Sequence, residues 1–148
     1  MVGKSSTLHV TEVLRTDFEE NLRLIKDSVE YIVSQGRKVV YDAEHFFDGY
    51  KENPAYALKT LEAAISGGAS IIVLCDTNGG SLPFEIEEIT NQVRQDMSCE
   101  IGIHAHNNQQ LAFANTIEAT IGGANLLDAS MAGLGRGAGN CPMELLLG

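Results

Sequence analysis

The sequence predicts an α/β protein built on a parallel β-sheet. Short apolar runs alternate with longer amphipathic segments about five times along the 148 residues. A spacing of about 30 residues from one apolar run to the next is typical of βα units, whose strands lie parallel. The length and a hydrophobic content of 44% suit a single domain, over residues 1–148, with one sizeable core. Such units form either an open doubly wound sheet or part of a (β/α)8 barrel, and periodicity does not distinguish the two.

The apolar runs mark the predicted strands, and capping residues mark the helices between them. The first helix is expected from the capping-box spacing of Thr16 and Glu19 to Gly36. The second begins at Asn53-Pro54 and ends at Gly67-Gly68. Further helices are expected after Ser81, from about Gln109 to Gly122-Gly123, and from Asn140-Cys141-Pro142. The predicted strands are Leu8 to Val10, Val39 to Tyr41, Ile71 to Leu74, Ile101 to Ile103 and Leu126 to Leu127.

Composition excludes several classes of protein. The formal net charge of −10 argues against a broad electrostatic surface for nucleic acid, so an anionic substrate needs a local cation, a metal or backbone amides. No apolar run reaches the roughly 18 residues of a membrane span, and the first residues lack the apolar core of a signal peptide. We therefore expect a cytoplasmic protein without membrane or nucleic-acid partners. Three widely spaced cysteines, Cys75, Cys99 and Cys141, are expected as free thiols in or near the core.

Polar residues recur at the end of successive predicted strands. The carboxyl edge of a parallel sheet is where ligands bind in both candidate folds, so these residues define a candidate site. Its members are His9, Asp42, Glu44, Asp76, Thr77, His104, His106 and Asn140.

His104 and His106 are the most specific feature of this set. Residues i and i+2 of a strand point to the same face, so both imidazoles can reach one divalent ion. A buried, hydrogen-bonded histidine pair is the alternative. Glu44 is a candidate general base, or else a solvated loop acid.

Two loops are candidate anion sites. Cys75 to Gly80 can hold a substrate carboxylate through the Thr77 hydroxyl and turn amides, or form an Asx-type turn before the next helix. The glycine-rich segment Gly133 to Asn140 can bring backbone amides close to an anion. Its position after the last strand argues against a dinucleotide-binding motif.

Taken in order, these motifs resemble the metal-dependent acyl-CoA condensing and aldolase superfamily of TIM barrels. This superfamily includes isopropylmalate, homocitrate and citramalate synthases and hydroxymethylglutaryl-CoA lyase. Up to about His106 the sequence is most similar to citramalate synthases, and three segments carry this similarity. They are Leu8-His9-Val10-Thr11-Glu12, Tyr41-Asp42-Ala43-Glu44-His45-Phe46-Phe47-Asp48-Gly49-Tyr50 and Cys75-Asp76-Thr77-Asn78-Gly79-Gly80.

The resemblance implies a role for each site residue. His104, His106 and Asn140 would hold a divalent metal (Mn, Mg or Zn), and Glu44 would be the acid/base group. Thr77 would bind the carboxylate of a 2-oxo acid, with His9 and Asp42 also contacting substrate. The implied reaction is condensation of acetyl-CoA with a 2-oxo acid. A pyruvate-releasing aldolase is the alternative within enzymes.

The sequence also departs from the family pattern. Asn108 stands where the synthases carry Asp, and Arg136-Gly137 replaces Glu-Arg in the glycine loop, which looks more like the aldolase branch. The Arg-Asp pair expected on the first barrel strand, with the third protein ligand, is missing. The chain thus corresponds to the fourth to eighth βα units of a barrel. We expect an incomplete barrel that forms a homo-oligomer or is completed by another chain, and an inactive structural module is the non-enzyme alternative.

Overall fold

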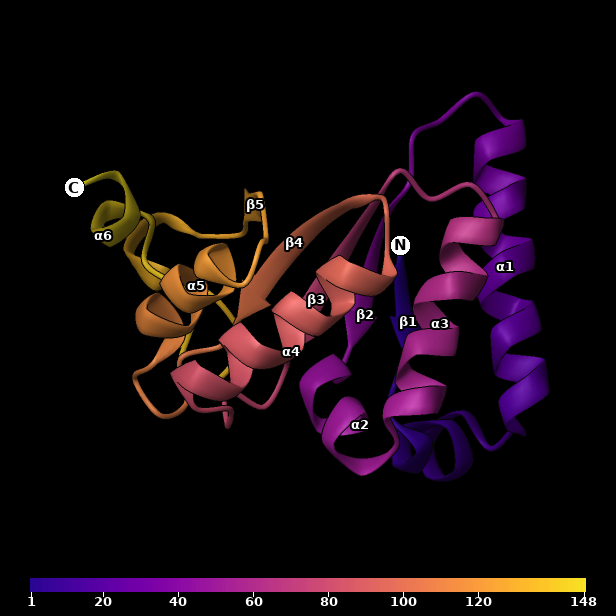
Figure 1. The fold of residues 1–148 in the computed structure, drawn as a ribbon, viewed down its shortest axis with the longest axis horizontal. Coiled ribbons are helices and arrows are strands. Elements are labelled where there is room, and N and C mark those ends of the chain that lie inside the picture. Colours follow the sequence, from indigo (N-terminus) through magenta and orange to yellow (C-terminus); the bar gives the residue numbers. More distant parts are fainter.

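The computed structural model describes residues 1–148 and contains one five-stranded parallel sheet (Figure 1). The strands pair in chain order, with β1 and β5 at the two edges. The sheet therefore does not close within the chain, as both an incomplete barrel and an open sheet require. The strands are β1 (Val2–Lys4), β2 (Val40–Glu44), β3 (Ile71–Asp76), β4 (Glu100–Ala105) and β5 (Leu126–Leu127).

Helices connect the strands, and Figure 1 shows the four longest ranged along the sheet in chain order. The four are α1 (Phe18–Ser34), α3 (Pro54–Ser66), α4 (Pro83–Asp96) and α5 (Ala112–Ile121). The short helices are α2 (Phe46–Glu52) and α6 (Met143–Leu147), with a π-helical turn at His9–Leu14 and a 3₁₀ turn at Met131–Gly133. No helix is long and apolar enough to cross a lipid bilayer.

The helices pack on one face of the sheet only. Alternate strand residues belong to the same buried cluster as helix residues such as Val29, Leu61 and Ile86. The strand members of this cluster include Tyr41, Ala43, Ile72, Leu74, Ile101 and Ile103. The intervening strand residues, from Val40 to His104, are absent from the cluster. Because successive side chains of a strand point to opposite faces, the polar residues of β2 and β4 lie on the face without helices.

The first strand differs from the sequence prediction. Residues 2–4 pair with residues 42–44 of β2, whereas Leu8 to Val10 lie in a helical turn. Three residues are too few for the hydrophobic periodicity to distinguish a strand from a helical turn. In the turn only Val10 is buried, while Leu8 is exposed. The predicted strand at Leu8 to Val10 is therefore wrong, and the other four strands are confirmed to within a few residues.

The helix ends also required corrections. Asp17, rather than Thr16, caps α1, because its side chain accepts a hydrogen bond from the Glu20 amide at 2.7 Å. Helix α5 begins at Ala112, three residues after its predicted start, and α6 begins at Met143, just after Pro142. Helix α2 was not expected, since seven residues are too few for a recognisable helical period.

The cap of α1 gives the first testable prediction. Replacing Asp17 with Ala removes the acceptor for a free helix amide, so the free energy of unfolding should fall by about 1 kcal/mol. The matched substitution Thr16→Ala should leave it within about 0.5 kcal/mol. Urea denaturation measures both. A larger loss for Thr16→Ala than for Asp17→Ala would contradict the assigned cap.

Candidate active site

The parallel register aligns polar side chains in one row across the helix-free face. Lys4 of β1 pairs with Glu44 of β2, and Cys75 of β3 pairs with His104 of β4. Residues of strands β1 to β4 and of the loops beyond the carboxyl edge of the sheet line a cavity of about 140 Å³. Its lining consists of Val2, Asp42, Glu44, Cys75, Thr77, His104, His106 and Arg136. Five of the eight predicted site residues therefore meet in one cavity, and His9, Asp76 and Asn140 are outside its lining.

The two histidines of β4 converge as the i, i+2 spacing predicts. Their Nε2 atoms lie 3.4 Å apart. The Nδ1 atom of His104 lies 3.2 Å from Oδ2 of Asp128, which suits a tautomer that donates to this carboxylate and leaves Nε2 free as an acceptor. Burial lowers the pKa of His106, with smaller contributions from His104 and Arg136. A neutral imidazole is the form that binds metals.

Asn140 lies beside this pair, although it does not line the cavity. Its backbone forms an antiparallel bridge with His106. Its Oδ1 atom is buried and has no hydrogen-bond partner. A buried carbonyl oxygen without a partner is energetically costly, so this oxygen is a candidate ligand for a cation.

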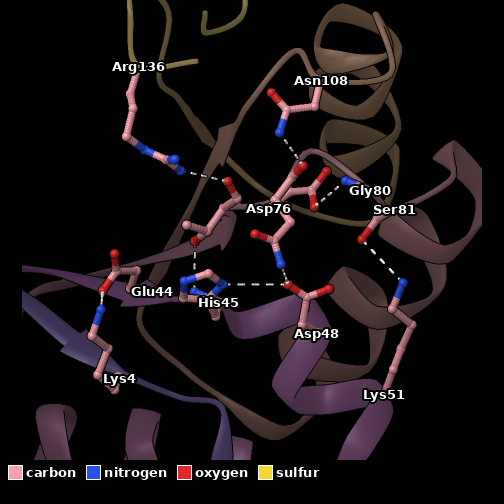
Figure 2. A network of polar contacts seen from close by, with 12 residues as sticks. Lys4, Glu44, His45, Asp48, Lys51, Asp76, Gly80, Ser81, Asn108 and Arg136 are labelled. Atoms are coloured by element: carbon pink, nitrogen blue, oxygen red, sulfur yellow. Dashed lines mark hydrogen bonds and ion pairs between the residues drawn. The ribbon is translucent and has the colours of Figure 1, made fainter. Parts of the chain in front are cut away.

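The carboxylates of β2 occupy different environments. Glu44 forms an ion pair with Lys4, which holds the carboxylate at the carboxyl end of β2 (Figure 2). Asp42 lies one pleat deeper, where burial raises its pKa. Both residues are within β2 rather than after it, because the strand runs three residues past its predicted end.

Thr77 is held from two sides. Its Oγ1 accepts a hydrogen bond from the His45 amide at 2.7 Å, and its carbonyl oxygen accepts one from Nη2 of Arg136 at 3.1 Å (Figure 2). The side chain is buried. These contacts fix the orientation of the Thr77 side chain. The Asx-type turn is also present, because the Gly80 amide donates to the Asp76 side chain.

His9 packs against His45, a residue that sequence reasoning did not select. The two rings are stacked with centroids 3.7 Å apart, and the Nδ1 atom of each is buried without a hydrogen-bond partner. Burial and the neighbouring His45 lower the pKa of His9. Asp48 lies 3.6 Å from Nδ1 of His45, and it accepts a hydrogen bond from Asn78 at 2.7 Å (Figure 2).

His45 occupies a strained position between β2 and α2. Its φ of 59° lies in the left-handed region, which is uncommon for residues other than glycine. This conformation turns its amide toward Thr77. The positive φ of His45 cannot be read from the sequence. The only sequence signal for this residue is its position next to Glu44.

The glycine loop brings Arg136 over the cavity. A side chain at Gly139 would approach the Gly133 carbonyl oxygen to 2.2 Å, so the loop folds back on itself more tightly than any other residue permits. The Asn107 amide donates to the Gly139 carbonyl at 2.8 Å and ties the loop to the end of β4. The position of Arg136 was not predicted, because loop closure depends on contacts far apart in the sequence.

The residues present fit a metal in part. Two imidazole nitrogens converge, a carboxylate orients one ring, and the backbone of Asn140 pairs with the other histidine. No group of three His, Cys, Asp or Glu side chains is arranged to bind a metal. The third protein ligand that the resemblance implies, an Asp carboxylate, is thus not arranged beside the two histidines.

Comparison with known proteins identifies the family. The HMGL-like family model matches residues 1–147. The chain belongs to the HMGL-like family. It is 52% identical over 139 residues to the (R)-citramalate synthase of Aquifex aeolicus, covering 93% of this chain and 26% of the synthase. It is 49% identical over 143 residues to the (R)-citramalate synthase of Sulfolobus acidocaldarius, covering 97% of this chain and 27% of that synthase. The chain therefore spans about a quarter of the length of these synthases.

Solved structures confirm the fold of this HMGL-like chain. The HMG-CoA lyase of Bacillus subtilis superimposes with a TM-score of 0.85 at 22% identity, covering 97% of this chain and 51% of the lyase. An HMG-CoA lyase from Acinetobacter baumannii, solved with coenzyme A and 3-methylmalate, gives 0.80 at 25% identity over 99% of this chain and 51% of that chain. The five-stranded sheet is thus part of a TIM barrel rather than an open doubly wound sheet.

The contact between His45 and Asp48 gives a prediction for the HMGL-like site. The neighbouring His45 ring, 3.6 Å away, is the main reason why the pKa of Asp48 lies below its ordinary value of 3.8. Replacing His45 with Gly, which tolerates positive φ, should raise this pKa. A depressed pKa means that the ionised carboxylate stabilises the fold above pH 3.8 and that this stabilisation is lost as the pH falls below that value.

Carbon-detected NMR titration of the Asp48 carboxyl measures the shift. Glu144 is the internal control, because its lowered pKa depends mainly on a hydrogen bond from the distant Ala132 amide. Its pKa should be the same in both proteins. An unchanged Asp48 pKa in the glycine variant would show that His45 does not hold this carboxylate.

Proposed function

We propose that this chain supplies the acid/base group and two metal ligands for an aldol-type condensation of acetyl-CoA with a 2-oxo acid. The observation that carries the proposal is the meeting of Glu44, His104 and His106 in one cavity at the carboxyl end of a TIM-barrel sheet. Identity near 50% to two citramalate synthases supports the choice of substrates. The (R)-citramalate synthase reaction is therefore the specific candidate.

His104 and His106 would hold the divalent metal, with the Asn140 oxygen close by. When bound, Mn, Mg or Zn supplies a Lewis acid that polarises the keto carbonyl of the 2-oxo acid. Asp128 would orient the His104 ring through Nδ1, as carboxylates do for many metal-binding histidines.

Glu44 would move the proton of the reaction. Condensation needs a base that removes a proton from the methyl group of acetyl-CoA. The Glu44 carboxylate lines the same cavity as both histidines, and its ion pair with Lys4 fixes its position. Thr77, with its hydroxyl oriented by His45, would bind the carboxylate of the 2-oxo acid, and His9 and Asp42 would support the substrate from the edges of the site.

Completion of the barrel stays a prediction. The sheet has two unpaired edges, and the missing carboxylate ligand leaves the metal site with fewer protein ligands than is usual for catalytic metals. We propose that a second copy or another chain covers these edges. Such completion would also supply the remaining ligand.

The reaction is tested by thiol release from acetyl-CoA, which occurs when water hydrolyses the thioester of the condensation product. The account predicts release that requires both pyruvate and Mn²⁺, and that falls by about 10² to 10⁴-fold in Glu44→Gln. The matched control Glu62→Gln, on the exposed face of α3, should retain the activity. Release without pyruvate would indicate a hydrolase, and pyruvate formation from citramalate without thiol chemistry would indicate the aldolase alternative. Equal rates for Glu44→Gln and Glu62→Gln would contradict the proposed base.

A further inference from the structure

The cavity contains a cation that the proposed chemistry does not use. Arg136 is the only Lys or Arg among the residues that line it, in a chain whose net charge is −10. No ion pair of the structure includes Arg136. An arginine that faces a cavity without an acidic partner is a candidate for binding an anion.

The guanidinium is held in place but is not saturated. Its Nη2 donates to the Thr77 carbonyl oxygen at 3.1 Å, and this is the one hydrogen bond that the side chain makes (Figure 2). A guanidinium carries five N–H donors, so most of them are left for a ligand. The glycine loop and the Thr77 carbonyl together fix its position, which lowers the entropy cost of binding.

Thr77 presents a second donor next to the first. Its Oγ1 already accepts a hydrogen bond from the His45 amide, so the hydroxyl proton is free to be donated elsewhere. Thr77 and Arg136 line the same cavity. A carboxylate has two oxygens, which suit one donor from the hydroxyl and one or two from the guanidinium.

We propose that Arg136 joins Thr77 in binding the substrate carboxylate, and that Arg136 makes the cavity select 2-oxo carboxylates over uncharged carbonyl compounds. This inference rests on the proposed function for its choice of ligand. It requires neither metal nor acetyl-CoA, because both donors belong to the chain itself. Arg136 is thus a specificity-determining residue rather than a loop tether.

The test is direct binding of pyruvate to the 148-residue chain in buffer containing EDTA, followed by NMR chemical shifts. Pyruvamide, which lacks the negative charge, is the comparison ligand. The unaltered chain should bind pyruvate at least about tenfold more tightly than pyruvamide, since hydrogen bonds to charged groups are the stronger ones. The shifts should be centred on Thr77 and Arg136.

Variants separate the charge of Arg136 from its role in the loop. Arg136→Gln retains an amide that can donate to the Thr77 carbonyl, but it removes the charge, so pyruvate affinity should fall about tenfold or more while pyruvamide affinity stays the same. Arg136→Lys keeps the charge without the planar fork and should lose less. Arg37→Gln makes the same charge change at an exposed position before β2 and should bind pyruvate like the unaltered chain.

Three results would overturn the proposal. The first is no pyruvate-dependent shift in the unaltered chain, and the second is equal affinity for pyruvate and pyruvamide. The third is equal pyruvate affinity in Arg136→Gln and Arg37→Gln. A selective carboxylate site without thiol release would instead support this inference while contradicting the proposed condensation, so the two failures are distinguishable.

Discussion

The parallel register of β2, β3 and β4 is the constraint on which the site depends. Ala43 pairs with Leu74, and Cys75 pairs with His104, so residues at the same level along neighbouring strands lie side by side. The alternation of each strand then sends apolar side chains to the helices and polar ones to the opposite face. A slip of one residue in any strand would bury Glu44 or His104 under the helices and expose Leu74 or Ile103. The same apolar packing that stabilises the sheet therefore fixes the geometry of the cavity.

Loops after the strands complete the cavity, and they depend on backbone conformations that few residues adopt. His45 has positive φ, and its amide reaches Thr77 from the end of β2. Gly139 also has positive φ and allows the glycine loop to return past His106. The buried carboxylate of Asp76 accepts hydrogen bonds from Gly80 and Asn115, which anchors the turn that carries Thr77 to α5. The site is thus held by contacts between neighbouring βα units rather than within one.

Sequence reasoning predicted the parts of the molecule that follow from local pattern. The spacing of His104 and His106, the apolar runs of β3 and β4, and the cap at Asn53 all have a direct physical meaning over a few residues, and the structure bears them out. The first strand was misplaced because Val2 to Lys4 contains one apolar side chain, and only its pairing with β2 makes it a strand. Arg136 reaches the site through long-range closure of the glycine loop, and the His45 amide reaches it through a positive φ, neither of which a local pattern encodes. Their roles emerged from the structure alone.

We propose that the two histidines of β4 form the metal-binding part of the site. Paramagnetic broadening by Mn²⁺ in NMR spectra of the labelled chain tests it most directly. If these histidines bind the metal, the ring signals of His104 and His106 and the Asn140 amide broaden first. The proposal also predicts that His104→Ala abolishes this localised effect while His9→Ala, which removes a histidine outside the cavity lining, preserves it. First broadening at the exposed acidic residues of α1, unaffected by His104→Ala, would contradict the account.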